Sequence, residues 1–288
     1  MTARTLMLVG FVALALPGVL LIFWARGQSA ALLEQPVVIE EHDLAKPEHV
    51  SFTRGERLVR HVLDCGGCHG EDLGGLKVSE SLLMGGFYAP NLTRGSGGVG
   101  GALDVAGWDR AIRHGVDADG RPLLHMPSDR WAVLSDRDLM DVLAYLERVP
   151  EVDREMLDSK VGPMYRLLLA TGDIQLPARQ IDHDAPRREI EPGPTVAYGT
   201  YLATISGCLD CHGEDLGGGP SPSGLPASPP IDRRALKDWK SADLGRALRE
   251  GLRPDGTRLD PYMPWPAYSG MTEEEVQALW MFLWVGGG

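Results

Sequence analysis

The chain has 288 residues, a length that suits two domains of ordinary size. It contains 36 glycines and 21 prolines, so we expect much of each domain to be loop. Its formal net charge of −12 at pH 7 argues against nucleic acid as a partner.

The first segment of the chain is long and apolar. Leu6 to Trp24 contains no charged residue and is flanked by two arginines. A helix of this length would span about 28 Å, close to the thickness of a bilayer core. We therefore expect residues 1–26 to form an uncleaved membrane anchor. The alternative is a cleaved signal peptide, because residues 29–31 offer a weak Ser-x-Ala cleavage site.

The next segments are a tether and a first domain. Residues 27–50 contain two prolines and several acidic residues, which is typical of a tether. The first domain is expected over residues 51–150. Its predicted helices run from Thr53 into Cys65, from Val105 to His114, and from a capping Ser135 to a stop at Pro150.

A Cys-x-x-Cys-His motif follows the first predicted helix of this domain, and a second copy lies 143 residues later. The octapeptide Cys-His-Gly-Glu-Asp-Leu-Gly-Gly is unchanged between them, at 68–75 and 211–218. The pattern is typical of covalent haem c attachment, with two thioethers to the haem and the histidine against the iron. The residues are Cys65, Cys68 and His69 in the first copy, and Cys208, Cys211 and His212 in the second.

Other interpretations of these cysteines fit less well. A thioredoxin-like redox pair expects one motif near a βαβ pattern, and the sequence has no such pattern. A zinc site built from both pairs would need ligands some 140 residues apart, whereas structural zinc ligands usually cluster. A disulfide would not require a histidine after each second cysteine. The two motifs use all four cysteines of the chain.

The second half repeats the plan of the first. Residues 151–193 form an interdomain linker, with helical apolar character over 156–170 that Gly162-Pro163 interrupts, and a flexible charged stretch from 182. The second domain is expected over 194–288. Its predicted helices cover 195–207, 242–250 and a stretch after Thr272. No strand pattern of any length is evident, so we predict an all-α fold.

The repeat also indicates the second axial ligand of each iron. When Met126-Pro127 is set against Met263-Pro264, the downstream residues match without a gap, and no other methionines coincide. These methionines lie 57 and 51 residues beyond their histidines, which leaves room for the chain to pass around a haem. We predict His/Met ligation of both irons, by His69 with Met126 and by His212 with Met263. His114 and His125 are the rival ligands in the first domain.

These motifs resemble the class I cytochrome c family, in particular tandem diheme cytochromes of bacterial respiratory chains. The resemblance covers roughly 51–150 and 194–288. The segments 88–93 and 119–121 also resemble cytochrome subunits of membrane-bound alcohol and sugar dehydrogenases, although those subunits carry three haem motifs. The resemblance implies two tandem cytochrome c domains behind an N-terminal transmembrane helix.

A filled sixth coordination position leaves no place for a substrate, so we expect an electron-transfer protein rather than an enzyme. It would pass single electrons between respiratory redox partners on the periplasmic side of a bacterial inner membrane. If residues near 1–31 are cleaved, the protein would be soluble in the periplasm. The rivals are a diheme enzyme, peroxidase-like or substrate-oxidising, and a cytochrome subunit of a membrane dehydrogenase complex. We also expect backbone carbonyls to orient the two histidines, with Pro90 and Pro229 as candidates.

Overall fold

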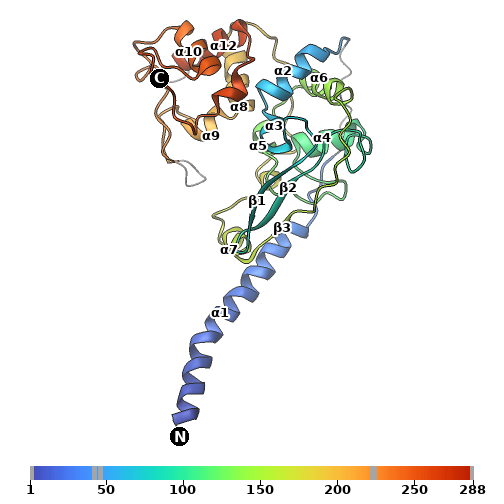
Figure 1. The fold of residues 1–288 in the computed structure, drawn as a ribbon, viewed down its shortest axis with the longest axis vertical. Coiled ribbons are helices and arrows are strands. Elements are labelled where there is room, and N and C mark those ends of the chain that lie inside the picture. Colours follow the sequence, from blue (N-terminus) through green and yellow to red (C-terminus); the bar gives the residue numbers. More distant parts are fainter. Residues whose placement is uncertain (1–2, 41–43, 45–47, 221–225, 286–288) are drawn as a thin grey trace.

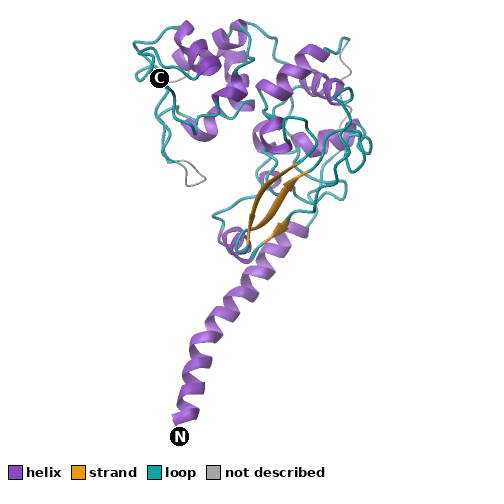
Figure 2. Cartoon of the chain, in the orientation of Figure 1, coloured by secondary structure: helices purple, strands orange, loops and turns teal. Residues whose placement is uncertain are grey.

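The computed structural model describes residues 3–40, 44, 48–220 and 226–285. Most of its regular structure is helical, and one long helix, α1 (Ala3–Glu34), projects away from the remainder (Figure 1). A small sheet lies between the end of α1 and the helices that follow (Figure 2).

The first helical unit occupies residues 52–146. Side-chain caps define three of its helix starts: the Ser51 hydroxyl accepts from the amide of Arg54, the Asp104 carboxylate from the amide of Gly107, and the Ser135 hydroxyl from the amide of Asp138. The predicted helix starts near 53, 105 and 135 are therefore confirmed to within a residue or so. The elements are α2 (Phe52–His61), α3 (Cys65–His69), α4 (Val105–Arg113), α5 (Ser128–Trp131) and α6 (Asp136–Leu146).

The second helical unit repeats this series over residues 196–285. Thr195 caps its first helix, and Thr272 forms a reciprocal capping box with Glu275 at the start of its last helix. The helices predicted from the sequence are again present. The elements are α8 (Val196–Ile205), α9 (Cys208–His212), α10 (Ser241–Glu250), α11 (Trp265–Tyr268) and α12 (Glu273–Val285).

In each unit the first and last helices cross at a glycine. A Cβ atom on Gly55 would lie 1.8 Å from the carbonyl oxygen of Asp141, and one on Gly199 would lie 2.0 Å from that of Ala278. Only glycine allows α2 to approach α6, and α8 to approach α12, this closely. Gly55 and Gly199 are therefore equivalent positions in the repeat.

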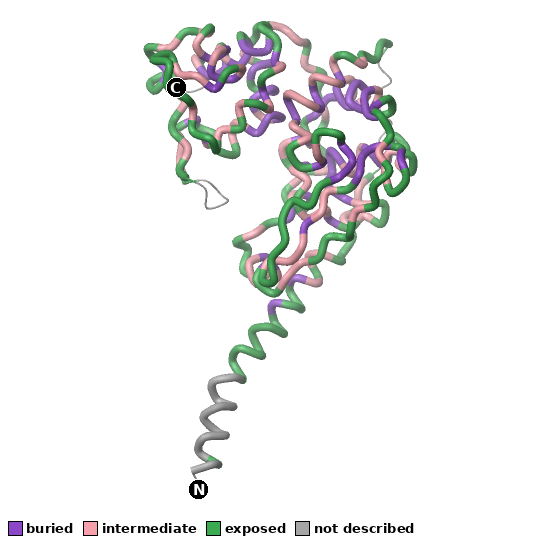
Figure 3. Tube along the Cα trace, in the orientation of Figure 1, coloured by how far each residue is buried: buried purple, intermediate pink, exposed green. Residues whose placement is uncertain are grey.

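The two units pack against each other through paired contacts. The Arg57 Nε donates to the Glu275 carboxylate at 2.9 Å, and the Tyr201 hydroxyl donates to the Asp138 carboxylate at 2.8 Å. Arg57 and Tyr201 each lie two residues after the crossing glycine, while Asp138 and Glu275 each lie three residues after the helix cap. The two contacts are counterparts, as in a two-fold interface. One cluster of buried apolar side chains includes residues of both units. Figure 3 shows buried backbone positions in each of them.

The all-α expectation is wrong for the segment after the first motif. β1 (Leu76–Ser81) and β2 (Gly85–Ala89) form an antiparallel hairpin, and β3 (Lys160–Val161) from the linker pairs with β2. Every residue of β1 is exposed, and Phe87 is the one buried residue of β2. Because neither strand has one clearly buried face, the alternation of apolar and polar residues that indicates a strand is short: it covers Leu76 to Ser79 in β1 and is absent from β2.

The linker contains one helix, α7 (Pro163–Thr171), and a 3₁₀ turn, η1 (Pro177–Arg179). Helical structure begins only at Pro163, because residues 160–161 pair in the sheet and Gly162 precedes the helix as its N-cap. Tyr165 and Leu169 of α7 pack with Phe87 in a second, smaller apolar cluster.

Helix α1 extends eight residues beyond the expected anchor, into the region predicted as a tether. Its last turns pack on α7: Ala25 and Ser29 are buried, and Arg166 Nη1 donates to the Ser29 hydroxyl at 3.1 Å. By length and composition, the stretch Leu16–Glu34 is apolar enough to cross a membrane. The same test is passed by signal sequences near an N-terminus.

Candidate haem-attachment sites

The two Cys-x-x-Cys-His motifs form short helices at matching places in the two units. In α3 and α9 all four cysteines are free thiols. The first cysteine of each pair, Cys65 or Cys208, is partly buried against the apolar core, and the second, Cys68 or Cys211, is exposed. Burial raises the pKa of the Cys65 thiol to about 12. Each pair thus presents two thiols, one turn apart, at the edge of an apolar surface.

The repeated octapeptide forms the same turn in both units. The amide of Gly75 donates to the His69 carbonyl at 2.8 Å, and the amide of Gly218 donates to the His212 carbonyl at 2.8 Å. Leu73 and Leu216 both adopt positive φ, at 56° and 59°. A leucine in the left-handed backbone conformation is strained. Here the hydrogen bonds of the turn and the burial of the leucine side chain stabilise that conformation. The identity of the octapeptides therefore reflects a demanding local geometry.

This turn places a backbone carbonyl against each histidine. The amide of Leu92 donates to the Leu73 carbonyl, which holds the chain so that Pro90 O lies 2.8 Å from His69 Nδ1. In the second unit Pro229 O lies at the same distance, 2.8 Å, from His212 Nδ1. The prediction that Pro90 and Pro229 orient the histidines is confirmed.

The two histidines have the protonation state that an iron ligand needs. A carbonyl oxygen can only accept, so Nδ1 carries the proton and Nε2 is left with its lone pair. Burial lowers the pKa of both His69 and His212, and the bond to the proline carbonyl only partly opposes this shift. A neutral imidazole held through Nδ1, next to two thiols, fits the donor set for covalent haem c.

The two Met-Pro segments also share one conformation. Pro127 has φ −79° and ψ 56°, and Pro264 has φ −80° and ψ 50°, which are the angles of an inverse γ-turn. In each case the amide after the proline donates to the methionine carbonyl at 2.8 Å. Met126 and Met263 are both partly buried and pack against the same core as the cysteines. The gap-free alignment of this region thus describes a real structural equivalence.

The rival histidines of the first unit have other partners. His114 Nδ1 lies 2.7 Å from His183 Nδ1, and the Arg187 guanidinium donates to His114 Nε2 at 2.6 Å, so both ring nitrogens of His114 are used. The His125 ring packs edge-on against Phe87 and Tyr165. These contacts also fix part of the linker, which the sequence suggested was flexible from residue 182.

One connection between the sites was missed from the sequence. Arg130, on the short helix after Met126-Pro127, donates to the Asp210 carboxylate inside the second motif at 2.8 Å. On the same helix, Trp131 Nε1 donates to the Ile205 carbonyl at 2.9 Å. Burial raises the pKa of Asp210, and the Arg130 guanidinium opposes that rise. The repeat contains no signal for this contact, because Ala267 stands at the position equivalent to Arg130.

Comparison with known proteins identifies the first unit. Residues 50–146 match the family described as "Cytochrome C oxidase, cbb3-type, subunit III". The chain is 34% identical over 101 residues to the fructose dehydrogenase cytochrome subunit of Gluconobacter japonicus, and 35% identical over 101 residues to the cytochrome c subunit of the quinone alcohol dehydrogenase of Gluconacetobacter polyoxogenes. These matches cover 31% and 32% of this chain but only 21% and 22% of the two subunits.

A longer match reaches into the second unit. The chain is 28% identical over 230 residues to a diheme cytochrome c-type protein of Cereibacter sphaeroides. This match covers 70% of this chain and 74% of that protein. The chain therefore contains a cytochrome c domain and is related to cytochrome c subunits of dehydrogenases and to a diheme cytochrome c. A cytochrome c domain implies covalently bound haem c.

Proposed function

We propose that the chain is a membrane-anchored diheme cytochrome that passes single electrons between redox proteins on the periplasmic side of a bacterial inner membrane. The observation that carries this proposal is the duplicated site. Both units combine two thiols, a histidine held by a proline carbonyl at 2.8 Å, and a Met-Pro γ-turn. The relationship to a diheme cytochrome c over most of the chain supports the same reading.

In this proposal Cys65 and Cys68 attach one haem and Cys208 and Cys211 attach the other. His69 and Met126 would hold the first haem iron, and His212 and Met263 would hold the second. Haem c held in this way would supply a reversible one-electron couple, which methionine ligation would shift to higher potential. The residues of this chain hold the histidine tautomer, keep the methionine loop in place and exclude water.

The contacts between the units support electron exchange within one molecule. Arg130 joins the helix after the first Met-Pro segment to Asp210 of the second motif, and the buried core is continuous across the interface. A rigid interface keeps two redox centres at a fixed separation. The chain also resembles dehydrogenase cytochrome subunits. This similarity supports a role for the protein as a subunit of a larger complex rather than as a free electron carrier.

The packing of α1 supports an uncleaved anchor. Ser29 is fully buried, Arg166 donates to its hydroxyl, and Arg179 Nη2 donates to the Leu32 carbonyl at 3.1 Å. Cleavage near residue 31 would remove Ser29, the partner of Arg166, and would leave Leu32 at or next to a new N-terminus. We expect the mature protein to retain residues 1–31. Mass spectrometry of the purified protein and its recovery in salt-washed membranes test this point.

The haem assignment is tested by counting haems. We expect the wild type to contain two haems per chain by pyridine haemochrome analysis, and both to be low-spin by EPR. The C208S/C211S variant should keep one. Two haems in that variant would overturn the assignment of Cys208 and Cys211 as attachment residues. A large high-spin population in the wild type would overturn the electron-carrier proposal and favour a peroxidase-like enzyme.

A further inference from the structure

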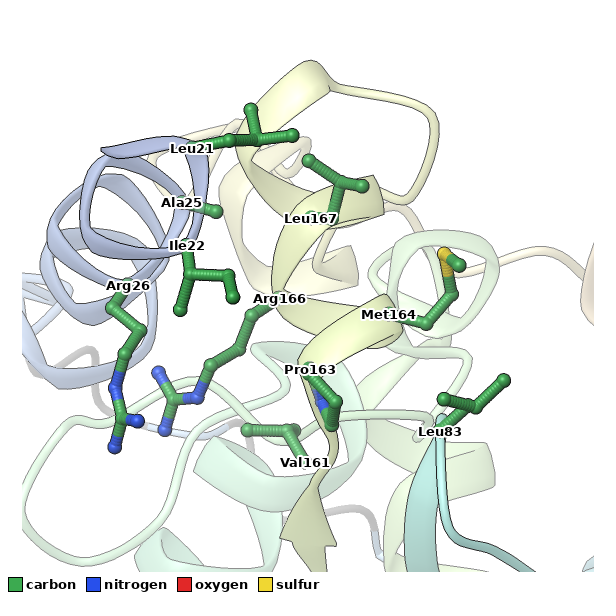
Figure 4. Close-up of a pocket in the computed structure, with 10 residues that line it drawn as sticks. All are labelled: Leu21, Ile22, Ala25, Arg26, Leu83, Val161, Pro163, Met164, Arg166 and Leu167. Atoms are coloured by element: carbon green, nitrogen blue, oxygen red, sulfur yellow. The ribbon is translucent and has the colours of Figure 1, made fainter. Parts of the chain in front are cut away.

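A groove lies between the end of α1 and the linker helix α7. It has a volume of about 410 Å³, and Leu83 from the hairpin tip closes one side (Figure 4). Its walls are mostly aliphatic. The residues used below are Leu21, Ile22 and Arg26 from α1, and Arg166 and Leu167 from α7.

The groove has an apolar end and a cationic end. Leu21 and Leu167 lie at one end, and the guanidinium groups of Arg26 and Arg166 lie on the same side at the other (Figure 4). Arg166 uses Nη1 for the Ser29 hydroxyl, which leaves its other donors available. Arg26 is exposed, and the described residues give its guanidinium no partner. Two guanidiniums beside an aliphatic wall suit an amphiphile with a negatively charged head.

Exposed apolar side chains also lie outside the groove, on α1 and at the hairpin tip. On α1 the Leu20 and Phe23 side chains, on faces of the helix turned away from the groove, are 59% and 68% exposed, and at the hairpin tip the Leu82 side chain is 94% exposed. Exposed apolar side chains on several faces of α1 are typical of a helix that is surrounded by lipid. Arg26 is the first charged residue after the apolar stretch Leu6 to Trp24, so under the proposed anchoring it stands at the level expected for lipid headgroups.

We propose that this groove binds one phospholipid. An acyl chain lies against Leu21, Ile22 and Leu167, and the phosphate lies between Arg26 and Arg166. The lipid fills the seam between anchor and linker and fixes the height of the haem units above the membrane. This inference rests on the proposed anchoring of α1. The charge of the two arginines is opposite to that of a lipid phosphate, whereas the chain as a whole is acidic.

The test uses the full-length, haem-loaded protein in detergent and native mass spectrometry. The probes are palmitoyl-oleoyl phosphatidylglycerol and the diacylglycerol with the same chains, which lacks the phosphate. We expect the wild type to bind one phosphatidylglycerol and to bind the diacylglycerol roughly tenfold more weakly. In the R26Q/R166Q variant, binding of phosphatidylglycerol should fall to the level of diacylglycerol.

Two controls separate charge from shape. The R179Q variant removes a guanidinium that bonds to carbonyls at the end of α1, outside the groove, and should bind lipid as the wild type does. I22W fills the groove and should weaken binding of both lipids, while F23W, on an exposed position of the same helix, should not. Equal binding of the two lipids by the wild type, or unchanged binding by R26Q/R166Q, would overturn the proposal. Displacement of the lipid by millimolar inorganic phosphate would also overturn it, in favour of a free-phosphate site.

Membrane fractionation tests the anchoring of α1 separately from the binding of lipid in the groove. R26Q/R166Q and I22W should remain in salt-washed membranes, because the apolar helix is intact. Wild-type protein in the soluble fraction would overturn the anchor and the lipid site together. Wild-type protein in the membrane without a phosphate-dependent lipid would overturn the lipid site alone.

Discussion

Arg54 and Tyr198 occupy equivalent positions in the two helical units, and they contact each other: Arg54 Nη1 lies 3.3 Å from the Tyr198 hydroxyl. Each is the residue before the crossing glycine of its unit. Equivalent residues meet only where a two-fold axis passes through an interface. We infer that the units associate as two copies of one domain would in a homodimer, so the interface contacts are open to paired mutagenesis.

The first prediction concerns the Arg57–Glu275 pair. The Glu275 side chain is 2% exposed, so the variant R57M leaves a buried carboxylate without its counter-charge. We expect R57M to lower the free energy of unfolding by about 1–3 kcal/mol, and R57M/E275Q to cost less than the sum of the single changes. Denaturant unfolding followed by circular dichroism measures all three.

A more exposed ion pair provides the control for the Arg57 and Glu275 variants. Arg137 pairs with Glu191 and Glu189, whose side chains are 83% and 48% exposed, and donates to the Ile190 carbonyl, so R137M should cost no more than about 1 kcal/mol. If R57M is no more destabilising than R137M, the interface contact contributes nothing to holding the units together.

The second prediction concerns the turn that supports His212. A Cβ on Gly218 would lie 2.5 Å from the Ser228 carbonyl, next to the segment that carries Pro229 O. G218A should therefore displace the carbonyl that holds Nδ1 of His212 and destabilise the protein by about 1–3 kcal/mol. Without this acceptor the imidazole is a weaker donor to iron, so the potential of that haem should rise. Redox titration followed optically gives the potential.

Gly219 is the matched control for Gly218. It also has positive φ, at 147°, but a Cβ there would meet nothing within 4 Å. G219A carries the backbone strain without the clash, so it should destabilise the protein while leaving the haem potential unchanged. If the haem potential shifts by the same amount in G218A and G219A, the Pro229 carbonyl does not tune the haem through His212.

The sequence predicted most of the helices, the two motifs and the proline carbonyls, because each has a local signal. Ser135 and Thr272 cap their helices through hydrogen bonds within three residues. The hairpin at 76–89 has only a four-residue alternation at its start, and the Arg130–Asp210 contact has no local signal. The hairpin strands lack a buried face, and the contact joins residues 80 positions apart that differ between the copies. Such features depend on tertiary packing, which a local pattern does not encode.

The third prediction tests the methionine ligands. M263A and M126A should each convert one haem from low-spin to a form that binds small ligands, lower its potential, and remove half of the methionine-to-iron charge-transfer absorbance. M140A is the control, because Met140 is also partly buried against the core but lies on α6, away from a Met-Pro turn. Unchanged spectra in M263A would exclude Met263 as a ligand.

The fourth prediction concerns His114 and the pH dependence of stability. The pKa of His114 is lowered to about 4, chiefly by burial; Asp109 opposes this shift, and Arg187, His183 and Arg113 add to it. The Arg187 guanidinium donates to Nε2, so His114 donates through Nδ1 to His183, and His183 donates through Nε2 to the Ala178 carbonyl. A second proton on His114 would point an N–H at the Arg187 donor.

The sign of the pH effect follows from this depressed pKa. The unfolded chain, in which histidine titrates near its ordinary value of about 6.5, binds the proton that the folded chain excludes. Stability should therefore be constant above about pH 6.5 and fall by on the order of 2 kcal/mol as the pH drops toward 4. Unfolding of the haem-loaded protein at a series of pH values measures this slope. The variant H114N should reduce the slope, whereas H49N, at an exposed position, should not. An identical slope in the wild type and in H114N would show that the contact between His114 and the linker does not depend on protonation.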